Sequence, residues 1–121
     1  MHDEDILALA ARAAGVDFDG YDAEQNCLYK NHTTSYGPGK SYWDPLGWEK
    51  DSLNLAVKLR IEISFSCEAS RYVACSYWIP WEGPGQVTEV MGDSPLESTQ
   101  RAIVLAAAEI GKHLLKETAH G

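Results

Sequence analysis

The chain has 121 residues and a formal net charge of −8, with 45% apolar and 23% charged residues. This size and balance are typical of one globular domain around a single core, so we expect one domain over residues 1–121. No apolar run approaches the ~20 residues of a membrane span, and the acidic start of the chain lacks the basic region of a signal peptide. We therefore expect a cytoplasmic protein, and the acidic charge argues against direct nucleic-acid binding.

The first predicted element is a helix over residues 3–14. Acidic side chains open the segment, Gly15 follows its end, and apolar residues recur at the i, i+3, i+4 spacing of one buried face. Turn residues come next, and residues 26–30 suit a short strand. Residues 31–41, NHTTSYGPGKS, predict a loop, because Gly-Pro-Gly does not fit a helix or a central strand.

A short helix is predicted after this loop, and its start has two interpretations. Either Asp44 caps a turn with Pro45 in its first position, or Asp51 and Ser52 start the helix proper, because these residues suit such positions. In both cases its expected apolar face consists of Leu53, Ala56 and Val57.

Three strands are predicted next from alternating polar and apolar residues. They cover residues 60–66, 71–79 and 86–91, with a hairpin connection over residues 67–70 and a chain break at PWEGPG, residues 80–85. In the first strand Ile61, Ile63 and Phe65 are expected to share one face, opposite Arg60, Glu62 and Ser64. In the second strand the shared face consists of Val73, Cys75, Tyr77 and Ile79.

The sequence from Ser94 onward predicts a long C-terminal helix. SPLE, residues 94–97, is a capping box in which Ser94 caps the helix and Glu97 reaches back to it. A stripe of apolar and small residues follows at Ile103, Ala107, Ile110, Gly111 and Leu114. The order of elements predicts an α+β fold, with an antiparallel sheet of three to four strands and the N- and C-terminal helices packed on one face.

Two segments resemble small uncharacterised proteins of proteobacterial phages and prophages. WDPLGWEKDSLNLAVKLRIEI, residues 43–63, is similar to a W(N/D)PL…LAVKL segment of those proteins. DSPLESTQRAIVLAAAEIG, residues 93–111, is similar to their C-terminal segment, and a more distant likeness extends to the NinX-like proteins of lambdoid phages. The resemblance implies a phage or prophage protein in the cytoplasm of a bacterial host, and it brings no catalytic residues with it.

Sequence motifs for catalysis and metal binding are missing. The four histidines lack HxxxH spacing, and the three cysteines, Cys27, Cys67 and Cys75, lack CxxC spacing. GPGKS, residues 37–41, lacks the frame of a phosphate-binding loop, and no nucleophile elbow is present. We therefore expect a non-enzymatic protein with no catalytic residue, no metal and no cofactor.

Aromatic residues and two arginines are the candidate ligand-binding residues. Aromatic rings offer a flat apolar area for stacking and a polar edge, and arginine pairs well with phosphate. The candidates are Tyr36, Tyr42, Trp43, Trp48, Arg71, Trp78, Trp81 and Arg101. The alternative is structural: the tryptophans fasten the loop to the short helix, and the arginines pair with surface carboxylates.

Two functions remain open at this point. The first is a phage or prophage accessory protein, acting in counter-defence, that binds a small nucleotide-like ligand between the loop before Trp48 and the strand end near Trp78. The second is an acidic inhibitor that docks on a host defence protein or a nucleic-acid-binding protein, which the charge of −8 favours. A homo-oligomer is compatible with both, because small domains often bury aromatic patches between copies.

Overall fold

A computed structural model describes residues 2–66, 71–80 and 82–120, the last five by their backbone only. The elements in chain order are α1 (Asp3–Ala14), β1 (Gly20–Asp22), β2 (Cys27–Thr34), β3 (Gly37–Trp43), α2 (Glu49–Leu59), β4 (Glu62–Phe65), β5 (Tyr72–Ile79), β6 (Gly83–Val90) and α3 (Pro95–His120). The predicted α+β class with N- and C-terminal helices is confirmed. The strands form two antiparallel three-stranded sheets, β1–β2–β3 and β4–β5–β6, where one sheet was predicted.

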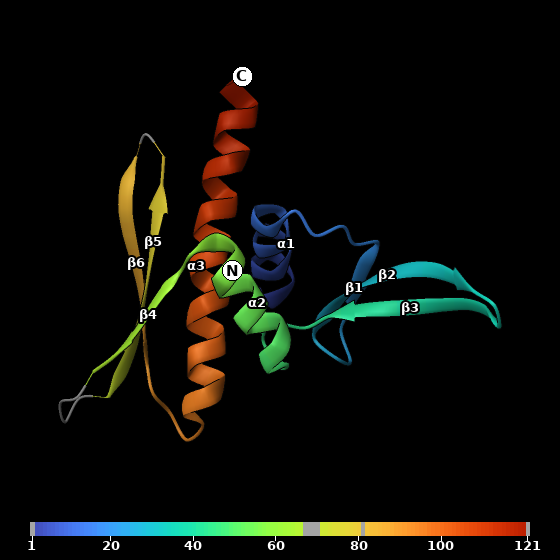
Figure 1. The fold of residues 1–121 in the computed structure, drawn as a ribbon, viewed down its shortest axis with the longest axis horizontal. Coiled ribbons are helices and arrows are strands. Elements are labelled where there is room, and N and C mark those ends of the chain that lie inside the picture. Colours follow the sequence, from blue (N-terminus) through green and yellow to red (C-terminus); the bar gives the residue numbers. More distant parts are fainter. Residues whose placement is uncertain (1, 67–70, 81, 121) are drawn as a thin grey trace.

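Helix α3 lies between the β4–β5–β6 sheet on one side and α1 with α2 on the other (Figure 1). The core forms where these layers meet, and it consists mainly of small and aliphatic side chains. Its fully buried members include Leu7, Ala10, Leu28, Val73, Cys75, Ala102, Val104 and Ala107. The many alanines of α3 let its neighbours approach closely, as the small-residue stripe predicted. Among the described residues, no helix is long and apolar enough to cross a membrane.

Helix α1 ends, and helix α3 begins, at the residues that the sequence predicts. Gly15 adopts the left-handed conformation after α1, with a φ of 70°, because glycine alone has no Cβ to oppose it. At the start of α3, the backbone N–H of Glu97 donates to Ser94 Oγ at 3.3 Å, so Ser94 is the predicted cap.

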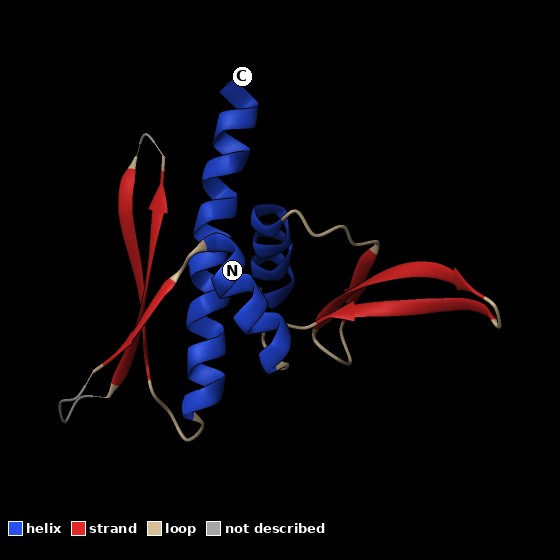
Figure 2. Ribbon diagram, in the orientation of Figure 1, coloured by secondary structure: helices blue, strands red, loops and turns tan. Residues whose placement is uncertain are grey.

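The predicted loop at residues 31–41 is wrong, because these residues form most of the β2–β3 hairpin (Figure 2). Gly-Pro-Gly fits here because β3 is an edge strand. Proline has no N–H to donate, and an edge strand needs hydrogen bonds to a neighbouring strand on one side only. Gly37 turns the chain with a φ of 115°, and Thr34 Oγ1 both donates to its carbonyl and accepts from the Tyr36 N–H.

The break predicted at residues 80–85 is also partly wrong. Strand β6 begins at Gly83, so GPG lies inside the strand and Pro84 pairs with Trp78 across the sheet. The physical reason is the same, because β6 is an edge strand. The expected hairpin connection over residues 67–70, with Cys67, lies outside the described residues.

Helix α2 begins at Glu49, so the predicted start at Asp51 and Ser52 is two residues late. The predicted turn at Asp44 and Pro45 is confirmed: it spans residues 45–47, and Asp44 Oδ1 accepts from the Gly47 N–H at 3.0 Å. The buried residues of α2 are Ser52, Leu55 and Ala56, whereas Leu53 and Val57 are 60% and 69% exposed. The predicted apolar face is therefore wrong for two of its three residues. Helix α2 packs sideways on α3, and this packing selects a face that the helical spacing alone does not identify.

Candidate interaction surfaces

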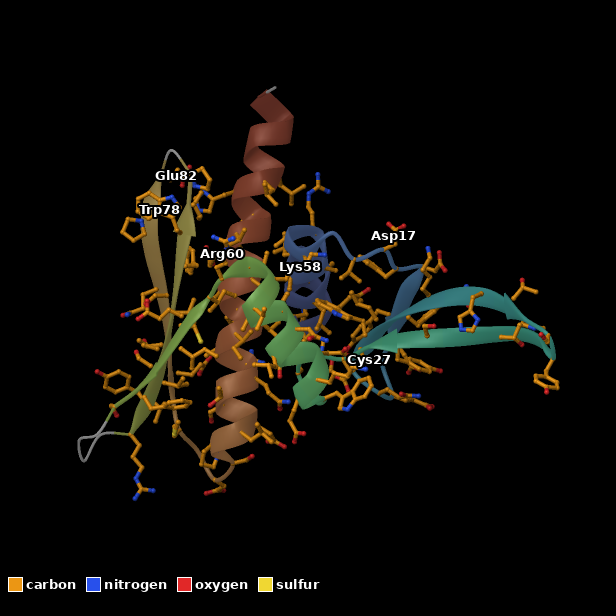
Figure 3. All side chains as sticks on the ribbon, viewed as in Figure 1. Asp17, Cys27, Lys58, Arg60, Trp78 and Glu82 are labelled. Carbon is orange, nitrogen blue, oxygen red and sulfur yellow. The ribbon has the colours of Figure 1, made fainter. Side chains whose placement is uncertain are left out.

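The predicted binding residues do not meet in one pocket. Tyr36 is fully exposed at the tip of the β2–β3 hairpin, and Tyr42 is half-exposed further along β3. Trp78 lies on β5, across the helical layer from this hairpin (Figure 3). Trp81 lies outside the described residues. The aromatic residues form two groups in the sequence, and the helical layer separates the first group from Trp78 in space.

Trp43 and Trp48 have structural contacts. Trp43 is half-buried against the core, on the opposite face of β3 from Tyr42. Trp48 caps α2, because its carbonyl accepts hydrogen bonds from the N–H groups of Asp51 and Ser52, both at 3.1 Å. Lys50 Nζ lies 5.6 Å from the centre of the Trp48 ring, within cation–π range.

Arg101 takes part in a polar network that links three elements. Its guanidinium donates to Asp3 Oδ1 of α1 at 3.2 Å and lies 3.7 Å from Glu89 Oε1 of β6. Asn26 Nδ2 donates to the other Asp3 oxygen at 2.9 Å. The hydrogen bond from Asn26, together with Arg101, holds the pKa of Asp3 below its ordinary value of 3.8. Arg101 therefore joins α1, α3 and β6, while Arg71 lies apart from it, exposed just before β5.

Helix α3 covers one face of the β4–β5–β6 sheet, and no helix or strand of the described residues covers the outer face (Figure 1). The shared face predicted for β5 is confirmed, and it points inward: Val73, Cys75 and Ile79 are buried, and Tyr77 packs against the core. Alternation then turns Tyr72 and Trp78 outward, where they are 41% and 66% exposed. Tyr72 pairs with Val90 of β6, which is 77% exposed.

This outer face carries little charge. Its strand positions are Glu62, Ser64, Tyr72, Ala74, Ser76, Trp78, Pro84, Gln86, Thr88 and Val90. Glu62 is the one charged residue among them, although charged residues make up 23% of the chain. An open hollow of about 390 Å³ is lined by Tyr72, Gln86, Thr88 and Val90 together with the charged Glu89. Sequence reasoning missed Tyr72 and Val90, although the predicted alternation already placed Tyr72 on the solvent side.

The second exposed surface is the arm, which we define as residues 30–42 of the β2–β3 hairpin. Most of its residues are exposed, and it projects away from the helices (Figure 1). On one face Lys40 Nζ lies 4.4 Å from the centre of the Tyr29 ring, a cation–π contact. Beside it Asn31, Pro38, Gly39 and Lys40 line a hollow of about 270 Å³.

The described cysteines are poor candidates for nucleophilic chemistry. Cys27 and Cys75 are both buried free thiols. Burial raises the pKa of Cys75 from 9.0 to about 11 and also raises the pKa of Cys27, so neither is a ready thiolate at neutral pH. Among the described residues, no three His, Cys, Asp or Glu side chains are placed to hold a metal ion.

Comparison of the chain with protein-family models, curated protein sequences and solved structures finds no match. The functional proposal therefore depends on the two exposed surfaces, the sheet face and the arm. Both are extended β surfaces, and neither is an enclosed cavity that would surround a substrate.

Proposed function

We propose that the protein is a non-enzymatic binding protein that docks on a partner protein through the outer face of the β4–β5–β6 sheet. The observation that carries the proposal is the composition of this face. Tyr72, Trp78 and Val90 are exposed there, and Glu62 is the one charge among its strand positions. Aromatic enrichment together with depletion of charge is the signature of the core of a protein–protein interface.

The resemblance to phage and prophage proteins makes a bacterial host protein the expected partner, in the host cytoplasm. Inhibition of a defence protein or a nucleic-acid-binding protein agrees with the formal charge of −8, because an acidic surface around an apolar centre steers a basic partner. In this arrangement Trp78 is the anchor, since tryptophan is enriched among residues that dominate binding energy.

A pair of matched double variants tests the proposal. Trp78→Ser with Val90→Ser removes the two most exposed apolar groups of the sheet face, and Trp48→Ser with Val57→Ser removes similarly exposed groups near α2. Tagged protein from bacterial cells is expected to retain its partner with the second pair and to lose it with the first, a change of at least 30-fold in affinity. Equal retention by both pairs would contradict docking through the sheet face.

A small nucleotide-like ligand on the arm is the second candidate. The stacked pair of Lys40 and Tyr29, beside the hollow that Asn31 lines, offers a cation for phosphate and a ring for a base. Thermal denaturation with a panel of nucleotides tests it: a ligand at a hundredfold excess over its Kd stabilises the fold by about 2.7 kcal/mol. No shift for any nucleotide at millimolar concentration, or a shift that Lys40→Gln leaves unchanged, would contradict it.

A further inference from the structure

The arm and the rest of the protein have opposite charge. The chain contains ten basic and eighteen acidic residues, and the arm contains two of the lysines, Lys30 and Lys40, but no Asp or Glu. The remainder therefore has eight basic against eighteen acidic residues, a formal net charge of −10. A surface with this division can attract a second copy of itself, arm to body.

The arm reaches far enough to act separately from its own acidic body. From Tyr29 to Thr34 the strand advances by about 17 Å, at ~3.3 Å per residue, whereas charges are screened within about 8 Å at physiological ionic strength. One ion pair, Lys30 with Asp17 at 3.8 Å, lies near the base of the arm. The tip carries Tyr36, which is fully exposed, an aromatic residue in a position to enter a hollow on another molecule.

A hollow that suits this side chain lies between α2, α3 and β4. Its volume is about 230 Å³, below the ~300–1,000 Å³ of typical small-molecule sites, so one side chain fills it better than a ligand does. The exposed apolar residues Leu53 and Leu96 line it, together with Ile63 and Ile103. Leu53 lies in α2 and Leu96 in α3, and neither belongs to the hydrophobic core. A contact with a second copy would explain why these two leucines are exposed.

The hollow is also acidic at its rim. Exposed Glu49 is the acidic residue among those that line it, and exposed Glu97 follows Leu96 in the chain. The basic residue at this end of α2, Lys50, is stacked over Trp48. The floor is fixed by the buried side chain of Gln100, whose amide, in the orientation that satisfies it, donates to the Leu46 carbonyl and accepts from the Glu49 N–H.

We infer that the protein self-associates, with the arm of one copy docked on a second copy so that Tyr36 enters the hollow between Leu53 and Leu96. Lys40 and Lys30 lie about 10 and 13 Å behind the turn, at ~3.3 Å per residue, so they face the acidic body of the second copy beyond the hollow. In its own chain the arm points away from this region (Figure 1), so the contact is between copies. The inference depends on the arm and the hollow, and it is independent of the proposed docking through the sheet face.

Light scattering coupled to size-exclusion chromatography tests this contact over a range of concentrations. We expect a dimer or larger assembly that Tyr36→Ser and Leu53→Glu each weaken by about 30-fold or more, and that added salt also weakens. Both positions are exposed, and unchanged circular dichroism and melting temperature will show that the variants fold. The matched control, Trp78→Ser, alters the sheet face and is expected to leave the assembly unchanged.

Mixing the two variants gives the sharpest form of the test. Tyr36→Ser retains an intact hollow and Leu53→Glu retains an intact tip, so the mixture is expected to form dimers at concentrations where each variant alone is a monomer. A wild-type protein that is monomeric at every concentration would overturn the inference. So would an assembly that depends on Trp78 and not on Tyr36, a mixture that stays monomeric, or a monomer whose arm retards a short DNA duplex.

Discussion

Gly111 offers a direct test of how closely α1 and α3 pack. A Cβ atom added at this position would lie 2.8 Å from the carbonyl carbon of Leu9 and closer still to its oxygen. These are backbone atoms of α1, so no change of rotamer relieves the overlap, and the two helices must move apart. Such overpacking typically lowers the free energy of unfolding by about 1–3 kcal/mol. We expect a value at the upper end of this range, because the buried contact between the two helices is lost when they move apart.

Gly111→Ala also has an opposing effect. Alanine in a helix interior is favoured over glycine by about 1 kcal/mol, so a position with free space would become more stable. Because the steric term is larger here, we expect the free energy of unfolding to fall by about 2 kcal/mol. For a chain of this length the melting temperature would then fall by about 8 °C.

Urea denaturation followed by tryptophan fluorescence and circular dichroism measures this change, with the slope of unfolding compared between variants. Gly92→Ala is the matched control, because no heavy atom lies within 4 Å of its added Cβ, and a change within about 0.5 kcal/mol is expected. A Gly111→Ala protein as stable as the wild type, or more stable, would refute the close contact between α1 and α3.

Three further predictions concern single side chains. Arg101→Gln removes the pairing with Asp3 and should lower the free energy of unfolding by about 0.5–1 kcal/mol at neutral pH. Because the pKa of Asp3 is lowered in the folded state, this loss should shrink as the pH falls below 3.8. Denaturation at several pH values measures the change. With its pKa raised from 9.0 to about 11, Cys75 should have about 100-fold less thiolate at pH 8 than an ordinary cysteine, so site-resolved alkylation of the folded protein should spare it. Gly85→Ala places a Cβ within 3 Å of the Tyr77 ring, and a lower urea midpoint is expected; an unchanged midpoint would show that the ring moves aside.

The helices of the core were predictable because local signals and burial agree there. Ser94 has the side chain that a helix cap requires, Gly15 has the freedom that a helix end requires, and both appear in those roles. The inner face of β5 followed from alternation in the same way. In these cases the role of each residue is determined mainly by its neighbours in the sequence.

The hairpin and the face of α2 were not predictable in the same way. Whether Pro38 ends a strand or sits in an edge strand depends on which strands are neighbours, and this is decided by long-range pairing. Leu53 and Val57 have core-like side chains, yet α3 contacts the neighbouring face of α2.

The candidate sites depend even more on distant contacts. Tyr36 and Trp78 suggested one aromatic cluster, and the extended arm places them on different sides of the helical layer.

A photoreactive amino acid at Thr88 tests the proposed docking most directly, because this exposed residue of β6 pairs with Ala74 on the outer sheet face and lines its hollow. The control position is Asn54, an exposed residue of α2. In bacterial cells we predict one discrete cross-linked product from Thr88 that Trp78→Ser abolishes, and no product of the same mass from Asn54. No product from Thr88, or the same product from both positions, would contradict the proposal that this sheet face binds a partner protein.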